Sequence, residues 1–175
     1  MSAAGAFATA EFTETMARFA TGVTVVTVAD DRDDIGSTVS AFASISAEPP
    51  IVMLSVTESS YLTEVIDRQG RFAVNVLGAR HRAIAGRFAA EGRPSARLLL
   101  ASEPHHRGAH TGALVLDTAV AALECSVTQR VEAGDHVVYL ATVDALPAVG
   151  DRATGGPGAA ASPLIRYAGR YRDLD

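Results

Sequence analysis

Lysine is absent from this 175-residue sequence, and all fifteen basic residues are arginine. A phosphate group bound by this chain must therefore be held by arginine, by hydroxyl groups or by backbone N–H groups. A positive net charge is also absent, because the formal net charge is −5 at pH 7. Such a composition offers no basic face to nucleic acid or to an anionic membrane, so we expect neither as a partner.

Cysteine occurs once, as Cys125, which excludes a disulfide within one chain. No apolar run approaches the roughly 20 residues that are needed to cross a bilayer. The opening residues, MSAAGAFATAEF, lack the basic start and the apolar core of a secretory signal. Together these absences predict a cytoplasmic protein.

The remaining composition is that of a globular protein, with 48% apolar and 20% charged residues. A chain of this length buries roughly 70% of its unfolded surface, which is enough for one core. Neither an internal repeat nor a shift in composition divides the sequence. We therefore expect a single domain over residues 1–175.

The N-terminal segment has the pattern of an amphipathic helix. Thr9 can cap it, and apolar side chains recur on one face at Phe12, Met16 and Phe19. This spacing predicts a helix over about 9–20.

Seven later segments have the β-branched or continuously apolar composition of strands. They cover residues 22–29, 36–47, 51–57, 71–77, 118–131, 136–149 and 163–174, and Pro49 and Pro50 are expected to end pairing after the second of them. Two short helices lie between these strands, too few to cover an open sheet. We therefore predict an α+β fold in which the sheet closes into a small barrel over about 22–174, because closure removes free strand edges.

The stretch GSTVSAFASISAEPP, residues 36–50, carries an unusual face. At the period of a strand, its even positions form a line of hydroxyls interrupted only by Phe42. The hydroxyl positions are Thr38, Ser40, Ser44 and Ser46. Two interpretations remain open from these residues: a half-buried strand that shows hydroxyls to water, or a polar shelf for a flat ligand.

A capped helix follows the strand 51–57. Ser59 or Ser60 can cap its start, and Gly70 is a suitable end. The first turn of such a helix points N–H groups and the positive end of the helix dipole outward. The pattern therefore fits ordinary capping, and it also fits a site for an anion.

A further helix is expected over about 80–90. Its arginines, Arg80, Arg82 and Arg87, can face solvent or meet a phosphate group. The segment 91–112 that follows has no helix or strand pattern and is about twice the usual length of a loop, which favours a lid or the edge of a binding site.

Three histidines lie close together at His105, His106 and His110. They have neither a cysteine nor a pair of carboxylates beside them, so we predict no metal site. Cys125 lies inside an apolar strand and is expected to be a buried small side chain. The motifs of α/β-hydrolases, P-loops and dinucleotide-binding turns are missing.

His136 follows the turn residues Gly134 and Asp135 at the start of a predicted strand. A histidine in this place can be an ordinary residue beside a turn. It can also meet a ligand at the rim of a sheet without being buried.

Taken together, these segments resemble the short-chain flavin reductases, the NAD(P)H-dependent partners of two-component flavin monooxygenases. The resemblance runs from about Met16 to Leu174. The segments that carry it are FATGVTVVT at 19–27, GSTVSAFASISAEPP at 36–50, FAVNVL at 72–77, RFA at 87–89, LEC at 123–125, GDH at 134–136 and PLIRYAGRYRDL at 163–174. It implies a homodimeric, Greek-key-like split β-barrel that binds FMN or FAD.

The resemblance also implies roles for particular residues. The positions expected to run along the flavin ring are Thr38, Val39, Ser40, Ser44, Ile45 and Ser46. Those expected near the phosphate are Ser55, Ser59, Ser60, Arg87 and Phe88, while Arg166 and Tyr171 are expected to approach the flavin pocket. His136 is expected beside the nicotinamide and is the residue assigned to the reaction.

The implied activity is NAD(P)H:flavin oxidoreductase, with NADH favoured over NADPH, and with FAD or FMN as the flavin. Hydride would pass from nicotinamide C4 to flavin N5, and reduced flavin would leave for a separate monooxygenase. A flavin carrier or sensor on the same fold is the alternative. An oxidase of the pyridoxamine phosphate type is disfavoured by the segments GDH and GRYRDL. Residues 91–112 differ from the phenylalanine-rich region of the family and are expected at the adenine end of a dinucleotide.

Overall fold

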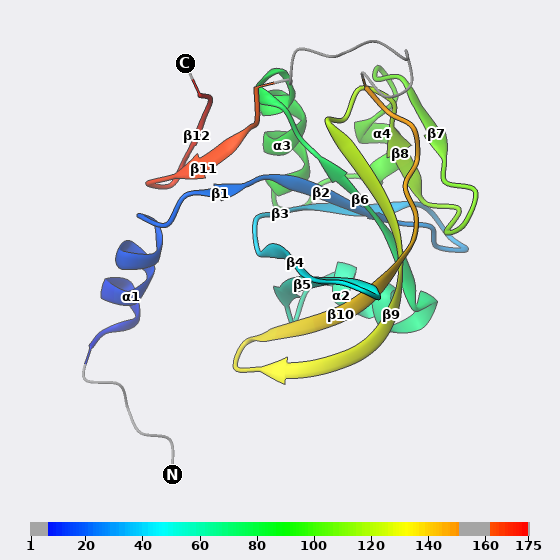
Figure 1. Cartoon of the computed structure of the whole chain (residues 1–175). Coiled ribbons are helices and arrows are strands. Elements are labelled where there is room, and N and C mark those ends of the chain that lie inside the picture. Colours follow the sequence, from blue (N-terminus) through cyan, green and yellow to red (C-terminus); the bar gives the residue numbers. More distant parts are fainter. Residues whose placement is uncertain (1–6, 151–161, 175) are drawn as a thin grey trace.

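The computed structural model describes residues 7–150 and 162–174. Its centre is a strongly curled, seven-stranded antiparallel sheet with the strand order β3-β2-β6-β9-β10-β5-β4 (Figure 1). The strands are β2 (Thr24–Val28), β3 (Ile35–Val39), β4 (Phe42–Ala47), β5 (Pro50–Thr57), β6 (Arg71–Val76), β9 (Ala121–Ala133) and β10 (His136–Ala145). The two edge strands, β3 and β4, are joined by only Ser40 and Ala41, so the sheet curls back toward itself. The predicted split barrel is confirmed.

Smaller elements surround this sheet. A three-stranded sheet pairs β1 (Thr21–Gly22), β11 (Ile165–Tyr167) and β12 (Arg170–Arg172), and a hairpin pairs β7 (His105–Arg107) with β8 (Leu114–Leu116). The helices are α1 (Thr9–Met16), α2 (Tyr61–Gln69), α3 (Arg82–Ala89) and α4 (Ala96–Leu99), with a 3₁₀ turn, η1 (Ala79–His81), before α3. None of the described helices is long and apolar enough to span a membrane.

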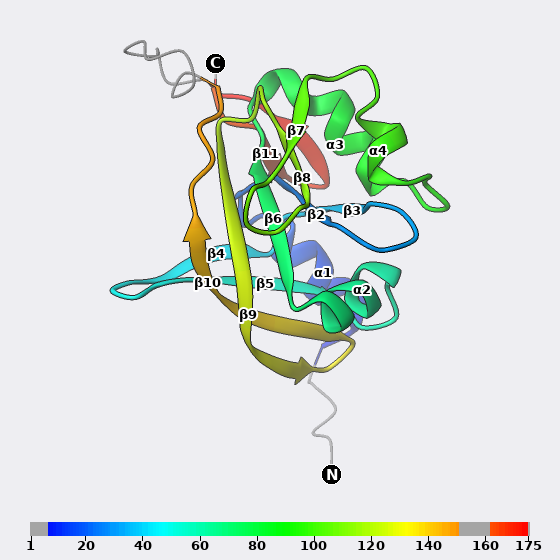
Figure 2. The ribbon, with the colours of Figure 1, turned by 90° about the vertical axis from the view of Figure 1, so that its right-hand side faces the viewer.

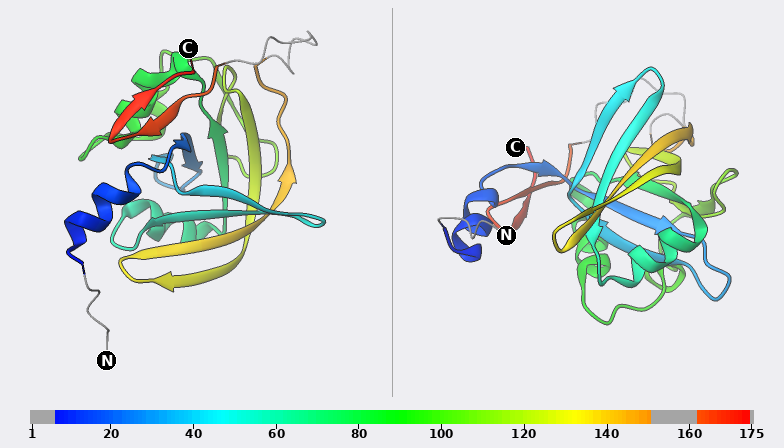
Figure 3. Two further views of the ribbon diagram at one scale, coloured as in Figure 1. Left: turned by 60° about the vertical axis from the view of Figure 1, so that its left-hand side comes forward. Right: turned by 90° about the horizontal axis from the view of Figure 1, so that it is seen from below.

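Two of the three predicted helices match closely, and α1 is shorter than expected. It ends at Met16, and its N-cap is Ala8 rather than Thr9. No residue of α1 is buried, and Phe12, Met16 and Phe19 are 53%, 47% and 67% exposed. The helix stands away from the curled sheet, beside the β11–β12 hairpin (Figures 1 and 3). Within the described chain the ring of Phe12 stacks on Phe7, with centroids 6.2 Å apart, and the stripe stays largely exposed.

The segment 36–50 forms two strands, so the prediction of a single strand was wrong. The chain turns at Ser40 and Ala41, and the pairing of β4 with β5 shifts by one residue at Ile45, which forms a bulge. A bulge rotates the residues that follow it relative to the sheet. Pro50 opens β5 opposite Ala47, so the two prolines lie at a hairpin and do not end pairing.

The segment 91–112 is also more ordered than the sequence indicated. Ser95 caps α4 by accepting a hydrogen bond from the N–H of Leu98 at 3.4 Å, and β7 pairs with β8. A four-residue helix and a three-residue strand are too short to produce a period in the sequence. These elements exist because Leu99, Leu100 and the residues of β8 pack into the core.

The core has two parts, and each includes one of the longer inserted helices. Leu62, Val65 and Ile66 of α2 are buried with Phe72 and Tyr139 of the sheet. The other part joins α3 and α4 to β8. Each fully buried large aliphatic side chain contributes about 1.5–3 kcal/mol. As a result, α2 and α3 are fixed on either side of the β2–β3 hairpin (Figures 1 and 2).

Candidate active site

A cleft of about 1020 Å³ lies where the β2–β3 hairpin, the start of α2 and the loop before α4 meet. Most of its lining comes from residues 35–41, 55–57, 59–62 and 91–95, with His136 at one edge and Asp30, Arg32 and Asp33 near the hairpin turn. The volume is at the upper end of the range for small-molecule sites, about 300–1,000 Å³. The cleft is therefore large enough for a ligand bigger than one mononucleotide.

The β3 wall of the cleft is fixed by α3. The hydroxyl of Thr38 donates to the carbonyl of Ala85 at 2.7 Å. A Cβ at Gly36 would lie 2.6 Å from the ring of Phe88, so the β3 backbone rests directly on that ring. The lining residues Gly36, Ser37 and Ser40 of this wall have small side chains, which leave room beside the backbone for a flat ligand.

The N-terminus of α2 forms a second wall. Ser60 is the N-cap, and its hydroxyl accepts from the N–H of Thr63 at 3.3 Å, while the hydroxyl of Thr63 donates to the carbonyl of Thr57 at 2.7 Å. Gly70 ends the helix in the left-handed conformation, with φ of 66°. The predicted cap and stop are confirmed. Ser59 and Ser60 both line the cleft, so the first turn of α2 faces it.

His136 is the first residue of β10 and lies opposite Thr57 of β5. Its Nδ1 is 2.7 Å from a carboxylate oxygen of Asp135. A carboxylate only accepts, so Nδ1 is the donor. This contact leaves Nε2 on the other side of the ring for another partner. The hydrogen bond from His136 is the main cause that lowers the pKa of Asp135, and the imidazole is 42% exposed at the rim of the cleft.

Three residues predicted to run along the same ligand lie elsewhere. Ser44 and Ser46 line a second, more apolar hollow of about 540 Å³ on the far part of β4, together with Phe42 and Val143. Ile45 is exposed at the bulge. The turn after Val39 and this bulge break the alternation, so the predicted continuous row of hydroxyls is wrong.

Arg87 and Phe88 do not line the cleft. The guanidinium of Arg87 pairs with Glu103 at 2.8 Å and donates to the carbonyl of Leu99 at 3.1 Å. Phe88 is fully buried beneath β3, so its side chain supports the wall and is not available to a ligand, and the prediction for it was wrong.

Arg166 and Tyr171 lie in the β11–β12 hairpin, where the guanidinium is 5.7 Å from the centre of the tyrosine ring. Neither residue lines the cleft of its own chain. Of the predicted cofactor residues, the cleft brings together Thr38, Val39, Ser40, Ser55, Ser59 and Ser60.

Sequence reasoning missed Arg93, which lines the cleft from the loop before α4. Its Nε donates to the carbonyl of Gly36 at 2.8 Å and its Nη1 to the carbonyl of Ala90 at 3.2 Å. Burial lowers the pKa of its guanidinium. The absence of lysine was the signal that pointed to arginines in general, but the folded contacts were needed to single out this one.

The histidines of the long segment serve local structure. Nδ1 of His105 contacts the carbonyl of Glu103, and His106 contacts Asp117. Among residues 7–150 and 162–174, no three side chains of histidine, cysteine, aspartate or glutamate are grouped to hold a metal ion. Cys125 is buried in β9, and burial is the main cause that raises its pKa to about 12, so the thiol is not a nucleophile at neutral pH.

The fold and the cleft define a small split-barrel protein with an open site for a large polar ligand. Residues 16–175 match the family described as flavin reductase like domain, and the chain belongs to that family.

Known relatives agree with this assignment. The chain is 36% identical over 173 residues to the NADH-dependent FMN reductase AsuE2 of Streptomyces nodosus subsp. asukaensis, covering 94% of this chain and 84% of that protein. It is 34% identical over 163 residues to the reductase component of 4-hydroxyphenylacetate 3-monooxygenase of Thermus thermophilus, covering 93% and 95%. The solved structure of the Streptomyces globisporus C-1027 NADH:FAD oxidoreductase SgcE6 in complex with NAD and FAD fragments has a TM-score of 0.81 and 28% identity, covering 95% of this chain and 92% of that chain.

Proposed function

We propose that this chain is an NADH-dependent flavin reductase that reduces FAD or FMN. The observation that carries the proposal is the single cleft in which a hydroxyl-bearing strand, a capped helix N-terminus and His136 converge. Its residues fit a flavin. Ser40 and Ser55 are small and polar, which lets backbone amides approach a flat ring, and the start of α2 suits a phosphate.

In the proposed complex, each wall of the cleft contacts a different part of the cofactors. The backbone of 38–40 and Ser55 hold the polar edge of the ring, while Ser59 and Ser60 hold the phosphate. His136, at the rim of the cleft, would contact the nicotinamide and position it through Nε2. The bound cofactors would supply hydride transfer between nicotinamide and flavin, so the protein has to provide orientation and exclusion of water.

We further propose that reduced flavin leaves for a separate monooxygenase. The similarity to a monooxygenase reductase component supports this partner. The open rim of the cleft also suits a flavin that is exchanged during turnover, because the walls at Ser59 and Glu91 are exposed.

A homodimer is part of the proposal. The exposed apolar stripe of α1 and the position of Arg166 and Tyr171, outside the cleft of their own chain, both support it. In a twofold dimer these residues would approach the cleft of the second copy. We also propose that the whole chain, 1–175, is one domain and that it acts in the cytoplasm, where NADH is available and the single thiol stays reduced.

The decisive experiment follows NADH oxidation by its absorbance after adding FAD, FMN or riboflavin to the purified full-length chain. We expect a rate that depends on added flavin. Flavin binding without any flavin-dependent NADH oxidation would favour a carrier or sensor and would overturn the reductase assignment.

A further inference from the structure

Arg93 is held in the cleft in an unusual way. Two of its three guanidinium nitrogens donate to backbone carbonyls, those of Gly36 and Ala90. Within the described parts of the chain, no carboxylate lies within ion-pair distance of it, whereas ion pairs are formed by Arg68, Arg82, Arg87, Arg97, Arg107 and Arg130. Arg93 is therefore a half-buried cation without a direct carboxylate partner among the described residues.

The surrounding loop holds this cation in place. Gly92 turns the chain with φ of 62°, and the N–H of Ala96 donates to the carbonyl of Asp34 at 2.8 Å. The loop is thus tied to the β2–β3 hairpin both at Arg93 and three residues later. A guanidinium fixed in this way loses little conformational entropy when it binds an anion, because its position is already set.

Arg32 is the other arginine of the cleft, but its surroundings differ. It lies in the turn between β2 and β3 with an exposed side chain, and no hydrogen bond or ion pair within the described residues fixes its guanidinium. Because the chain has no lysine, Arg93 is the cleft cation that the described fold holds in a fixed position for a phosphate group.

The cleft then has two features suited to anions, on opposite sides of one hairpin. Asp30 of the hairpin contacts Tyr61 and Arg68 of α2, while Asp34 contacts the loop of Arg93. The helices α2 and α4 lie on either side of β2 and β3 in two perpendicular views (Figures 1 and 2). An FMN molecule has one phosphate and needs only one of these features.

We propose that Arg93 binds the diphosphate of an adenine dinucleotide in this cleft and so favours dinucleotides over mononucleotides. This inference rests on the proposed function and goes further, because it names the residue that distinguishes the two ligand classes. The shared chemistry is a diphosphate joined to adenosine, which both FAD and NADH contain. A guanidinium binds two phosphate oxygens at once, and such charge-assisted hydrogen bonds are about twice as strong as neutral ones.

The test measures binding to the full-length protein by calorimetry, without turnover. The ligands are riboflavin, FMN, FAD and ADP, and NAD⁺ is added to protein saturated with FMN. The variants are Arg93→Gln, Arg93→Lys and a control, Arg71→Gln, which removes an exposed arginine that also donates to a backbone carbonyl but does not line the cleft. We expect Arg93→Gln to weaken ADP binding at least about tenfold, while FMN and riboflavin binding stay within about twofold. Arg93→Lys should retain part of the affinity, and Arg71→Gln should leave the binding of every ligand unchanged.

The two dinucleotides are separated by the same measurements. If Arg93→Gln loses affinity for FAD, Arg93 contacts the flavin dinucleotide; if it loses affinity for NAD⁺, Arg93 contacts the nicotinamide dinucleotide. Either result supports the proposal. An equal loss of affinity for FMN and FAD, or no loss of affinity for any ligand, overturns the proposal while leaving the reductase assignment intact. Wild-type protein that binds no flavin at all would instead contradict the proposed function.

A salt series on the wild-type protein keeps the test valid if Arg93→Gln fails to fold. We expect ADP and the responding dinucleotide to bind more weakly at high ionic strength, because a charge contact with the protein is screened. Riboflavin serves as the uncharged reference. Identical salt dependence for ADP and riboflavin overturns the proposal.

Discussion

At the scale of single residues, His136 shows how a neighbour fixes the chemistry of a side chain. Asp135 accepts from Nδ1, which sets the tautomer and leaves Nε2 for a ligand at the cleft rim. In the proposed reaction the cofactors carry the chemistry, so we propose that this histidine positions the nicotinamide and is not an obligatory acid or base.

We predict that His136→Ala weakens the use of NADH more than the binding of flavin. The KM for NADH should rise or the rate at low NADH should fall several-fold, while the flavin dissociation constant stays within about twofold. Steady-state kinetics and a separate flavin titration give the two values. An equal loss of both would show that His136 serves the flavin.

The two serines at the start of α2 allow helix capping and ligand binding to be tested separately, because only one of them caps the helix. Ser60 caps the helix, so Ser60→Ala should lower the free energy of unfolding by about 1 kcal/mol. Ser59 does not cap, so Ser59→Ala should leave stability unchanged. We expect both variants to weaken the binding of FMN several-fold more than the binding of riboflavin, which lacks the phosphate. Urea unfolding and flavin titration measure the two effects, and equal effects on FMN and riboflavin would exclude a phosphate site here.

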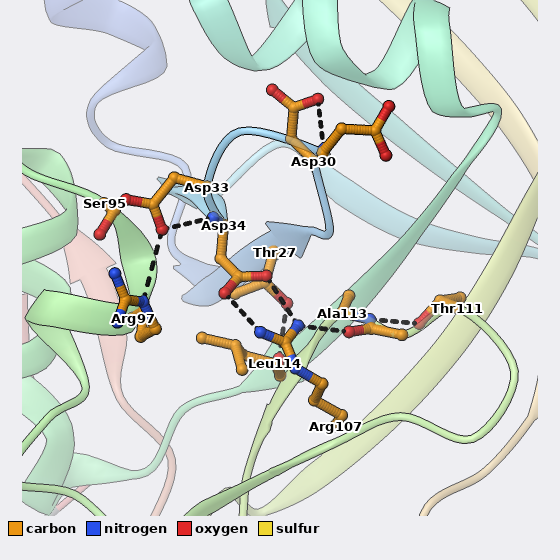
Figure 4. A network of polar contacts seen from close by, with 12 residues as sticks. Thr27, Asp30, Asp33, Asp34, Ser95, Arg97, Arg107, Thr111, Ala113 and Leu114 are labelled. Carbon is orange, nitrogen blue, oxygen red and sulfur yellow. Dashed lines mark hydrogen bonds and ion pairs between the residues drawn. The ribbon is translucent and has the colours of Figure 1, made fainter.

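At the scale of elements, the β2–β3 turn is fixed by contacts with β7 and α4 that its sequence does not indicate. The acidic run DDRDD, residues 30–34, has the composition of a solvated turn, but Asp34 is buried and forms two hydrogen bonds, both 2.9 Å, with the guanidinium of Arg107 (Figure 4). Asp33 faces Ser95 and Arg97 of the α4 segment in the same view. The turn therefore links the β2–β3 hairpin to α4 and β7, and so helps to fix the loop that carries Arg93.

The same turn gives a prediction for acid. The hydrogen bond from Arg68 is the main cause that lowers the pKa of Asp30 from its usual 3.8. A carboxyl group with a lowered pKa stabilises the fold above its unfolded pKa, and that stability is lost as the pH falls through the folded value. Asp30→Asn should therefore be less stable than wild type at pH 7, and the difference should shrink below about pH 4.

Urea unfolding of both proteins between pH 7 and pH 3 measures this difference. Asp31→Asn is the matched control, because Asp31 lies in the same turn and forms no ion pair within the described residues. A wild-type advantage that grows in acid would contradict the assigned direction.

Elements with local signals could be predicted, and elements made by tertiary contacts could not. The helix α2 has a serine cap, a periodic apolar face and a glycine stop, all readable in sequence. The break after Val39 and the bulge at Ile45 depend on pairing with β5, which alternation alone does not encode. For the same reason the hydroxyls at 38–40 reach the cleft, whereas Ser44 and Ser46 do not. Arg93 was missed because its importance comes from what it lacks, a carboxylate partner, and only the fold reveals that.

At the scale of the whole molecule, apolar side chains are exposed where the segment around α1 and β1 meets the β11–β12 hairpin. The β1–β11–β12 sheet joins the segment after α1 to the C-terminal hairpin, and Phe12, Phe19 and Tyr167 of this region are exposed. Exposed apolar side chains grouped in this way are typical of an interface. Because Arg166 and Tyr171 belong to the same hairpin, an interface here would bring them beside a second chain.

We predict that Phe12→Ser with Phe19→Ser converts a dimer into a monomer. Both side chains are more than half exposed in the single chain, so their loss should change the fold of the chain little. The control is Leu98→Ser, since Leu98 is equally exposed but lies on α4. Sedimentation should give a dimer for wild type and the control and a monomer for the double variant. The monomer should also bind flavin less tightly if Arg166 and Tyr171 complete the cleft of the partner, whereas a monomeric wild type would show that the stripe has another use.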